Sequence, residues 1–374
     1  MRFEFATATR IVFGCGERRH LAAAARELGS RALVVCGSNP ARVEAVTAGL
    51  PEPVVFSTAG EPTTDTVCRG VERAREANCD VVVAVGGGSA IDAGKGIAAL
   101  ATNPGGPLDY LETAGAGKPL ERRPLPVIAV PTTAGAGAEV TRNAVLRAPG
   151  AGVKASLRGA WLAPAVALVD PELTRELPAG LTAATGMDAL AQLIEPFTSI
   201  RANAMADLYC AEGIRLVSRW LPRAVEHPGD MEARTAMSLA SLYGGIALSN
   251  AGLGAVHGFA APIGGLFDAP HGAVCGALLA AVMAANLRAL RARDPGNPAV
   301  GRYEQVARLA GVEDAVAWVD SLRRRLAIPR LREYGLGAEQ VDGVVEAARR
   351  ASSMKGNAVA LTPEELADAL EAAR

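Results

Sequence analysis

The chain has 374 residues, half of them hydrophobic and 4% aromatic, and its formal net charge is −1. This length exceeds what one hydrophobic core ordinarily serves, so we expect two domains. Mixed charges with almost no net charge offer no attraction to nucleic acid or to an anionic membrane, and we expect neither as a partner. The chain start lacks an apolar signal core, no segment predicts a spanning helix, and six scattered cysteines suit a reducing compartment, so we expect a cytoplasmic protein.

The first patterned segment is residues 3–13, in which apolar and polar side chains alternate. This period predicts an edge strand. Further along, residues 32–36, 81–85 and 127–130 are apolar throughout and alternate with helical stretches. Such runs are typical of parallel strands covered on both faces. The sequence therefore predicts an α/β domain with a parallel, Rossmann-like sheet.

Glycine-rich turns follow these apolar runs. In Gly86-Gly87-Gly88-Ser89 we expect Ser89 to cap the next helix, with Asp92 as a capping-box partner. Glycines and helix N-terminal amides together suit a phosphate group. A second glycine-rich turn, residues 131–139, follows the next run, and two such turns at one sheet edge favour a dinucleotide. A plain tight turn is the alternative for either loop.

After residue 177 the pattern becomes helical. We place an α/β dinucleotide-binding domain at residues 1–176 and an all-helical domain at 177–374, with the substrate expected in the cleft between them. Proline and glycine separate the predicted helices, which are residues 203–223, 230–250, 273–293, 303–310, 313–326, 338–352 and 363–374.

Two of the four histidines, His257 and His271, lie fourteen residues apart in a mostly apolar stretch. Buried imidazole needs a hydrogen-bond partner, a metal or a substrate. Asp188, on a predicted helix upstream, supplies a carboxylate that can join them. The alternative is a pair of core histidines with satisfied hydrogen bonds.

Taken in order, these motifs resemble the iron-containing (group III) alcohol dehydrogenase family, which includes lactaldehyde reductase, glycerol dehydrogenase and maleylacetate reductase. The resemblance covers nearly the whole chain, from Arg10-Ile11-Val12-Phe13-Gly14 to Pro270-His271-Gly272. It implies an NAD(P)-dependent oxidoreductase acting on CH–OH groups. It also implies that the cofactor contacts Gly87, Gly88, Ser89, Asp92, Thr132, Thr133 and Lys154.

The resemblance further implies a metal bound by Asp188, His257, His271 and the residue at position 192. Gln192 stands where the family has histidine, and Ala261 where many members have another. Two histidines and a carboxylate suit iron or zinc, whereas Gln192 offers only a neutral amide oxygen. A metal-free site therefore stays open, in which His257 or His271 donates a proton or hydrogen bond to the carbonyl oxygen.

The loop after the first buried strand bears on the choice of cofactor. NAD-binding domains usually present a carboxylate to the ribose, but Gly37, Ser38 and Asn39 include no acid, and Arg42 lies nearby. We therefore expect this loop to accept either NADH or NADPH.

We expect a dehydrogenase or aldehyde reductase that acts on a small alcohol or carbonyl substrate, with His257 and His271 catalytic. The alternatives are a maleylacetate-reductase-like enzyme and a dinucleotide-binding protein that has lost catalysis. Since relatives pair through N-terminal strands, the resemblance also implies a homodimer.

Overall fold

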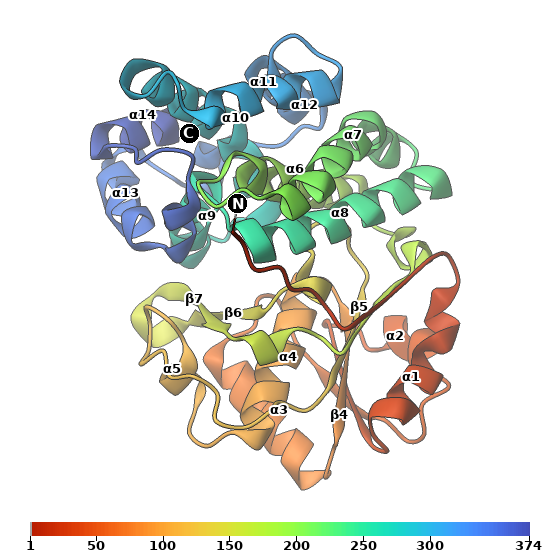
Figure 1. Ribbon diagram of the computed structural model, residues 1–374. Helices are drawn as coiled ribbons and strands as arrows, with labels where there is room; N and C mark the ends of the chain where they lie inside the picture. Colours follow the sequence, from red (N-terminus) through yellow and green to blue (C-terminus); the bar gives the residue numbers. More distant parts are fainter. Residues whose placement is uncertain (1) are drawn as a thin grey trace. The chain divides into compact units, whose positions relative to one another are not determined.

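The computed structural model describes residues 2–374, apart from the side chains of Arg42 and Ala151, so the expectation for Arg42 lies outside the described residues. The chain folds into two compact units (Figure 1). The α/β unit contains Thr7–Thr133 and Gly137–Thr174, and the helical unit contains residues 2–6, Ala134–Ala136 and Arg175–Arg374. The predicted fold class is confirmed.

The α/β unit is built on a six-stranded sheet with the order β1-β8-β5-β4-β2-β3, in which every pairing is parallel. The strands are β1 (Arg10–Phe13), β2 (Ala32–Cys36), β3 (Val54–Ser57), β4 (Val81–Gly86), β5 (Val127–Pro131) and β8 (Val166–Val169). Five helices belong to this unit: α1 (Leu21–Leu28), α2 (Ala41–Thr47), α3 (Thr64–Glu76), α4 (Gly88–Thr102) and α5 (Pro107–Tyr110).

Alternate side chains of the central strands fill two separate cores. Leu33 and Val82 pack with residues of α3 and α4, whereas Val34 and Val83 pack with residues of α1 and α2 on the opposite face. Both faces are thus covered, which explains why these strands are apolar along their whole length.

An antiparallel pair, β6 (Asn143–Ala148) and β7 (Val153–Arg158), lies outside the main sheet. The sequence analysis did not predict it. Each strand carries exposed or half-buried side chains between its buried ones, so neither shows the continuous apolar run that marked the central strands.

The predicted edge strand over residues 3–13 is wrong in its first part, because the strand covers only Arg10–Phe13. Residues 2–6 belong to the helical unit. There the side-chain amide of Asn250 both accepts from the Ala6 N–H (2.7 Å) and donates to the Ala6 carbonyl (2.9 Å), while Phe5 stacks on Tyr209. The backbone of Ala6 is therefore hydrogen-bonded to the Asn250 side chain instead of to a neighbouring strand.

The helical unit has one large hydrophobic core. At its centre α6 (Ala179–Thr198) packs against three other helices, α7 (Ala204–Glu226), α8 (Met231–Ala251) and α10 (His271–Arg293). The remaining helices are α9 (Ala255–Leu266), α11 (Pro298–Ala310), α12 (Ala315–Arg325), α13 (Val341–Arg350) and α14 (Pro363–Ala373). The sequence did not predict α9, because this helix contains Pro262 and several glycines, which ordinarily interrupt helices.

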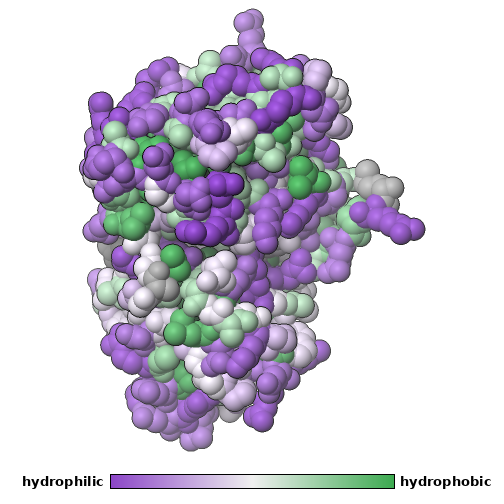
Figure 2. All heavy atoms as spheres, turned by 90° about the vertical axis from the view of Figure 1, so that its left-hand side faces the viewer, coloured by the Kyte–Doolittle hydropathy of each residue, from purple (hydrophilic) through white to green (hydrophobic). Residues whose placement is uncertain are grey.

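One helix, His271–Arg293, is long and apolar enough to cross a membrane by length and composition alone. However, 78% of its most apolar window is buried inside the protein, as expected for the core helix of a soluble protein. On the face shown in Figure 2, hydrophilic residues predominate and apolar ones are scattered among them.

Candidate metal and active site

Three helices of the helical unit supply the predicted metal-binding side chains. Asp188 and Gln192 lie four residues apart on α6 and therefore share a face. His257 lies in the first turn of α9, and His271 is the first residue of α10. The turn holding His271 approaches α6 closely at Gly272, where an added Cβ would lie 2.4 Å from the carbonyl oxygen of Ala184.

The structure brings Asp188, His257 and His271 together. Asp188 Oδ1 lies 3.3 Å from His257 Nε2 and 3.8 Å from His271 Nε2, and the two imidazole centroids are 5.5 Å apart. Asp188 and His257 are buried, whereas the His271 side chain is 38% exposed. The exposed edge of this cluster is therefore at His271.

Glu195 lies one further turn along α6 and contacts His257 from the other side. Its Oε2 lies 2.6 Å from His257 Nδ1, and its Oε1 accepts from the Val256 N–H at 2.7 Å. The carboxylate accepts a hydrogen bond from Nδ1–H, which leaves the Nε2 atom of the ring to face Asp188. The sequence analysis did not assign Glu195 to the site, although its spacing of seven residues from Asp188 places both on one helix face.

The charges in this cluster shift its pKa values in opposite directions. Burial lowers the pKa of His257, but nearby Cys275, Glu195 and Asp188 outweigh it and raise this pKa well above its ordinary value. Cys275 and Asp188 likewise raise the pKa of His271 against the effect of burial. For Asp188, burial raises the pKa, but the two histidines and a hydrogen bond with Gln192 more than compensate and lower it. The cluster therefore favours a positive charge at its centre.

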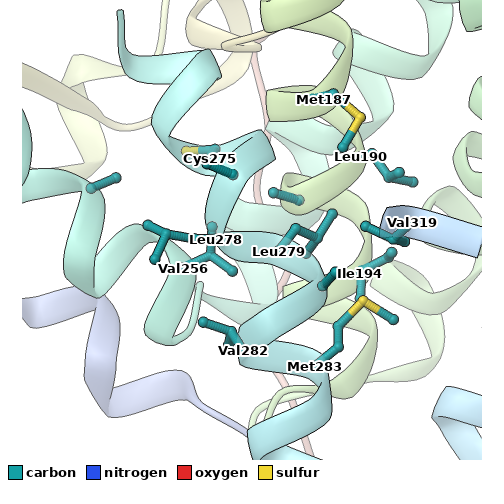
Figure 3. Close-up of a cluster of buried hydrophobic side chains, with 14 of the residues drawn as sticks. Met187, Leu190, Ile194, Val256, Cys275, Leu278, Leu279, Val282, Met283 and Val319 are labelled. Carbon is teal, nitrogen blue, oxygen red and sulfur yellow. The ribbon is translucent and has the colours of Figure 1, made fainter. Parts of the chain in front are cut away.

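Cys275 is the residue that sequence reasoning missed here. It packs in the hydrophobic core shown in Figure 3. Yet its Sγ lies 3.8 Å from His257 Nε2 and 3.7 Å from His271 Nε2. Cys275 follows His271 by four residues, which places both side chains on one face of a helix. This spacing would have predicted their contact only if the helix had been known to begin at His271.

The residues of this cluster fit a divalent cation. Ligand atoms of Asp188, His257, His271 and Cys275 all lie within 4.8 Å of one another. Asp188 Oδ1 and Gln192 Oε1 are buried, and neither has a hydrogen-bond partner among the described residues. Buried oxygen atoms without partners are costly, and a metal ion would satisfy them. Ala261, one turn after His257, contributes no ligand atom.

The predicted cofactor-binding turns meet at one edge of the parallel sheet. β5, β4 and β2 are neighbours, so the turns after them adjoin. The Thr132 N–H donates to the Gly86 carbonyl at 2.9 Å, and an added Cβ on Gly87 would lie 3.4 Å from the Thr133 side chain. Gly87, Gly88, Ser89, Thr132 and Thr133 are all partly exposed.

The predicted cap of α4 is wrong. The helix begins at Gly88, and Gly87 is the N-cap, with no side-chain hydrogen bond, so Ser89 lies inside the first turn. The backbone leaves the extended conformation after Gly87, two residues before Ser89, so the helix has already begun at Gly88. The first amides of α4 are consequently not blocked by a capping side chain, as a phosphate-binding helix start requires.

Two other predicted cofactor contacts have partners within the α/β unit. An Asp92 oxygen accepts from the Val145 N–H at 3.2 Å, which ties α4 to β6. The Lys154 ammonium, on β7, forms an ion pair with Glu61. In the loop after β2, Ser38 and Asn39 are exposed and Gly37 is half-buried, and Asn39 Oδ1 accepts from the Ala41 N–H at the start of α2.

A parallel α/β sheet with an uncapped glycine turn, together with a histidine–carboxylate cluster among helices, is typical of dinucleotide-dependent oxidoreductases that use a metal. Comparison with known proteins agrees. Residues 8–171 match the iron-containing alcohol dehydrogenases, and residues 182–374 match the C-terminal part of the Fe-containing alcohol dehydrogenase family.

Individual relatives match across most of their length. The chain is 37% identical over 311 residues to alcohol dehydrogenase 4 of Schizosaccharomyces pombe, covering 82% of this chain and 71% of that protein. The crystal structure of 1,3-propanediol oxidoreductase superposes with a TM-score of 0.90 at 32% identity and covers all of both chains. Sulfoacetaldehyde reductase from Bifidobacterium kashiwanohense in complex with NAD+ gives a TM-score of 0.85 at 30% identity, covering 99% of this chain and 98% of that chain.

The chain therefore belongs to the iron-containing alcohol dehydrogenase family. It is an oxidoreductase of the alcohol dehydrogenase type.

Proposed function

We propose that this protein interconverts a small primary alcohol and its aldehyde, with hydride transfer between the substrate carbon and the nicotinamide of NAD(P). The observation that carries this proposal is the convergence of Asp188, His257 and His271 on one point of the helical unit. Structural similarity to 1,3-propanediol oxidoreductase supports a short primary alcohol as substrate.

Residues of the α/β unit bind the cofactor in this proposal. Gly87, Gly88 and Ser89 offer backbone amides to the pyrophosphate at the start of α4. Thr132 and Thr133 lie beside this turn and contact the cofactor towards its nicotinamide. Asp92 and Lys154 act indirectly, because each already has a partner that fixes α4 or β7.

Residues of the helical unit bind the metal and the reacting oxygen. Asp188, His257 and His271 would hold the ion, and Gln192 lies one turn after Asp188 on the same face of α6. A divalent ion bound there supplies Lewis-acid stabilisation of the charge that develops on the substrate oxygen. Glu195 fixes the ring of His257, and His271, on the exposed side, lies where the substrate oxygen has access.

Steady-state kinetics test this proposal directly. Oxidation of NADH and NADPH is measured with propanal, 3-hydroxypropanal and maleylacetate, and reduction of NAD+ with propanol and 1,3-propanediol. We expect turnover of the aldehydes and alcohols, with His271→Ala lowering kcat about 100-fold or more. Turnover of maleylacetate alone would instead indicate enoate reduction, and binding of NADH without any turnover would indicate a protein that has lost catalysis.

We further propose a homodimer. β1 has a strand neighbour, β8, on one side only, which leaves the other edge of this short strand for pairing with a second copy. Light scattering coupled to size-exclusion chromatography gives the mass in solution, and a mass of one chain would contradict the proposal.

A further inference from the structure

Cys275 occupies a ligand position in the metal cluster. It lies one helical turn after His271 on α10 and is fully buried. Its Sγ is 3.8 Å from His257 Nε2 and 3.7 Å from His271 Nε2. Around a tetrahedral ion with Zn–S of about 2.3 Å and Zn–N of about 2.0 Å, ligand sulfur and nitrogen atoms lie about 3.5 Å apart. The observed separations are therefore close to those of a shared ion.

The neighbours of Cys275 independently indicate a cation at this point. His257 directs Nδ1 to Glu195, so the Nε2 that faces Cys275 carries a lone pair in the neutral ring. Asp188 Oδ1, in a residue that is 3% exposed, is directed at the same Nε2 and has no hydrogen-bond partner among the described residues. Lone pairs that face one another in a buried site repel, so either a proton on Nε2 or a metal ion lies between these atoms, and a metal ion satisfies the Asp188 oxygen and both imidazoles together.

Ligand chemistry distinguishes Cys275 from Gln192. Gln192 offers a neutral amide oxygen, a poor ligand for a transition metal. A cysteine thiolate is a strong ligand and, together with imidazole and carboxylate, is typical of zinc sites. Cys210, which is equally buried in the helical core, belongs to no metal-binding cluster among residues 2–374.

We propose that Cys275 binds the catalytic metal as a thiolate, so that the ligand set is Asp188, His257, His271 and Cys275, and that this set selects zinc over iron. Cys275 releases its thiol proton to solvent when the ion binds. The inference rests on the proposed metal-assisted function, and it assigns to Cys275 the fourth ligand position that the neutral Gln192 fills poorly.

X-ray absorption at the zinc edge tests the proposal on the wild-type protein without mutation. We expect one sulfur at about 2.3 Å and the remaining shell made of nitrogen and oxygen. A shell of nitrogen and oxygen alone would overturn the assignment. Alcohol oxidation by the same sample is assayed separately, so that a sulfur-free but active enzyme refutes only Cys275, whereas an inactive enzyme with bound sulfur refutes only the proposed function.

Cobalt substitution identifies the cysteine. Cobalt bound to thiolate gives a charge-transfer absorption in the near ultraviolet, which we expect in wild type and in Cys210→Ser but not in Cys275→Ser. Competition between zinc and ferrous iron is then measured by elemental analysis, and we expect the preference for zinc to fall at least tenfold in Cys275→Ser. An unchanged cobalt spectrum in a folded Cys275→Ser protein would refute the proposal. Should that variant fail to fold, the wild-type absorption data still decide it.

Discussion

Glu195 determines how His257 is presented to the metal cluster. The Glu195 carboxylate accepts a hydrogen bond from His257 Nδ1–H at 2.6 Å and another from the Val256 backbone N–H. These two bonds fix the position of the carboxylate and the orientation of the His257 ring. Such outer carboxylates raise the basicity of the ligating nitrogen and typically contribute 10- to 100-fold to metal affinity. Glu195 is thus a positioning residue rather than a ligand.

Glu195→Gln tests this role. Because the amide provides a weaker acceptor than the carboxylate, we expect the zinc affinity to fall about 10- to 100-fold. Competition with a chromophoric chelator measures it. Glu346→Gln, a change at a side chain that is 58% exposed, serves as the control and should leave the affinity unchanged. Equal affinities in all three proteins would remove Glu195 from the site.

We expect the residue at position 37 to influence whether the loop after β2 accepts NADH or NADPH. An added Cβ at Gly37 meets no atom within 4 Å, so a larger residue fits without disturbing the loop. We expect Gly37→Asp to shift the ratio of kcat/KM values towards NADH by roughly ten- to hundredfold, through repulsion of the 2′-phosphate and a hydrogen bond to the ribose. The neutral Gly37→Asn should shift it less. A ratio that moves equally in both variants would contradict the charge argument.

At the scale of elements, a buried lysine joins α4 to the segment that leads into β6. Lys95 donates to the Thr141 carbonyl at 3.1 Å, to Thr141 Oγ1 at 2.8 Å and to the Asn143 carbonyl at 3.0 Å. Burial lowers the pKa of Lys95 to about 8, although Asp92 and Glu139 oppose this. Burial raises the pKa of Glu139 from 4.5 to about 7, partly offset by a backbone hydrogen bond and by Lys95. The hydrogen bonds of Lys95 thus fix the middle of α4 against Thr141 and Asn143.

The raised pKa of Glu139 predicts a pH dependence of stability. Between pH 4.5 and about 7 the unfolded chain has lost this proton while the folded protein still holds it. The contribution of Glu139 to stability therefore falls as pH rises through this window, by at most about 3 kcal/mol. Glutamine does not titrate, so we expect the melting temperature of Glu139→Gln relative to wild type to increase from pH 4.5 to pH 7. Parallel curves for the two proteins would contradict the assignment.

The whole molecule carries its two sets of binding residues in different units. The Gly86–Ser89 turn, Thr132 and Thr133 lie in the α/β unit, whereas the candidate metal cluster and residues 134–136 of the second glycine-rich turn belong to the helical unit. Because the proposed metal ligands come from three separate helices, an ion bound to them would link α6, α9 and α10. Binding that occurs only in the folded state stabilises that state.

Metal removal should therefore lower the melting temperature. Free zinc at 100 times its Kd adds about 2.7 kcal/mol to the stability of the folded state, and a chelator removes this contribution. Differential scanning calorimetry with and without chelator measures the effect, and we expect Asp188→Asn to respond less than wild type. A wild-type melting temperature that is insensitive to chelator and to added zinc would show that no metal binds.

The sequence determined the α/β class of the first unit, the central strands of its sheet, most helices of the second unit and the identity of the family. Continuous apolar runs such as Val81–Gly86 predict strands because strands covered on both faces need apolar side chains throughout. Glycine-rich turns indicate a phosphate site because a helix start that binds phosphate excludes large side chains. Asp188, His257 and His271 could be named because few residue types bind metals and the family motif orders them.

Only the tertiary structure decided which further side chains complete the site. Pro262 and the glycines up to residue 265 gave α9 no helical pattern in the sequence. The start of α10 at His271 was therefore not predicted, and neither was the position of Cys275 one turn after His271. Glu195 and Cys275 meet His257 from opposite sides, although they lie 62 and 18 residues away along the chain. The local sequence pattern specifies which face of a helix is polar. Which polar atoms face each other depends on how α6, α9 and α10 pack, and no single segment of the sequence encodes the relative positions of these helices.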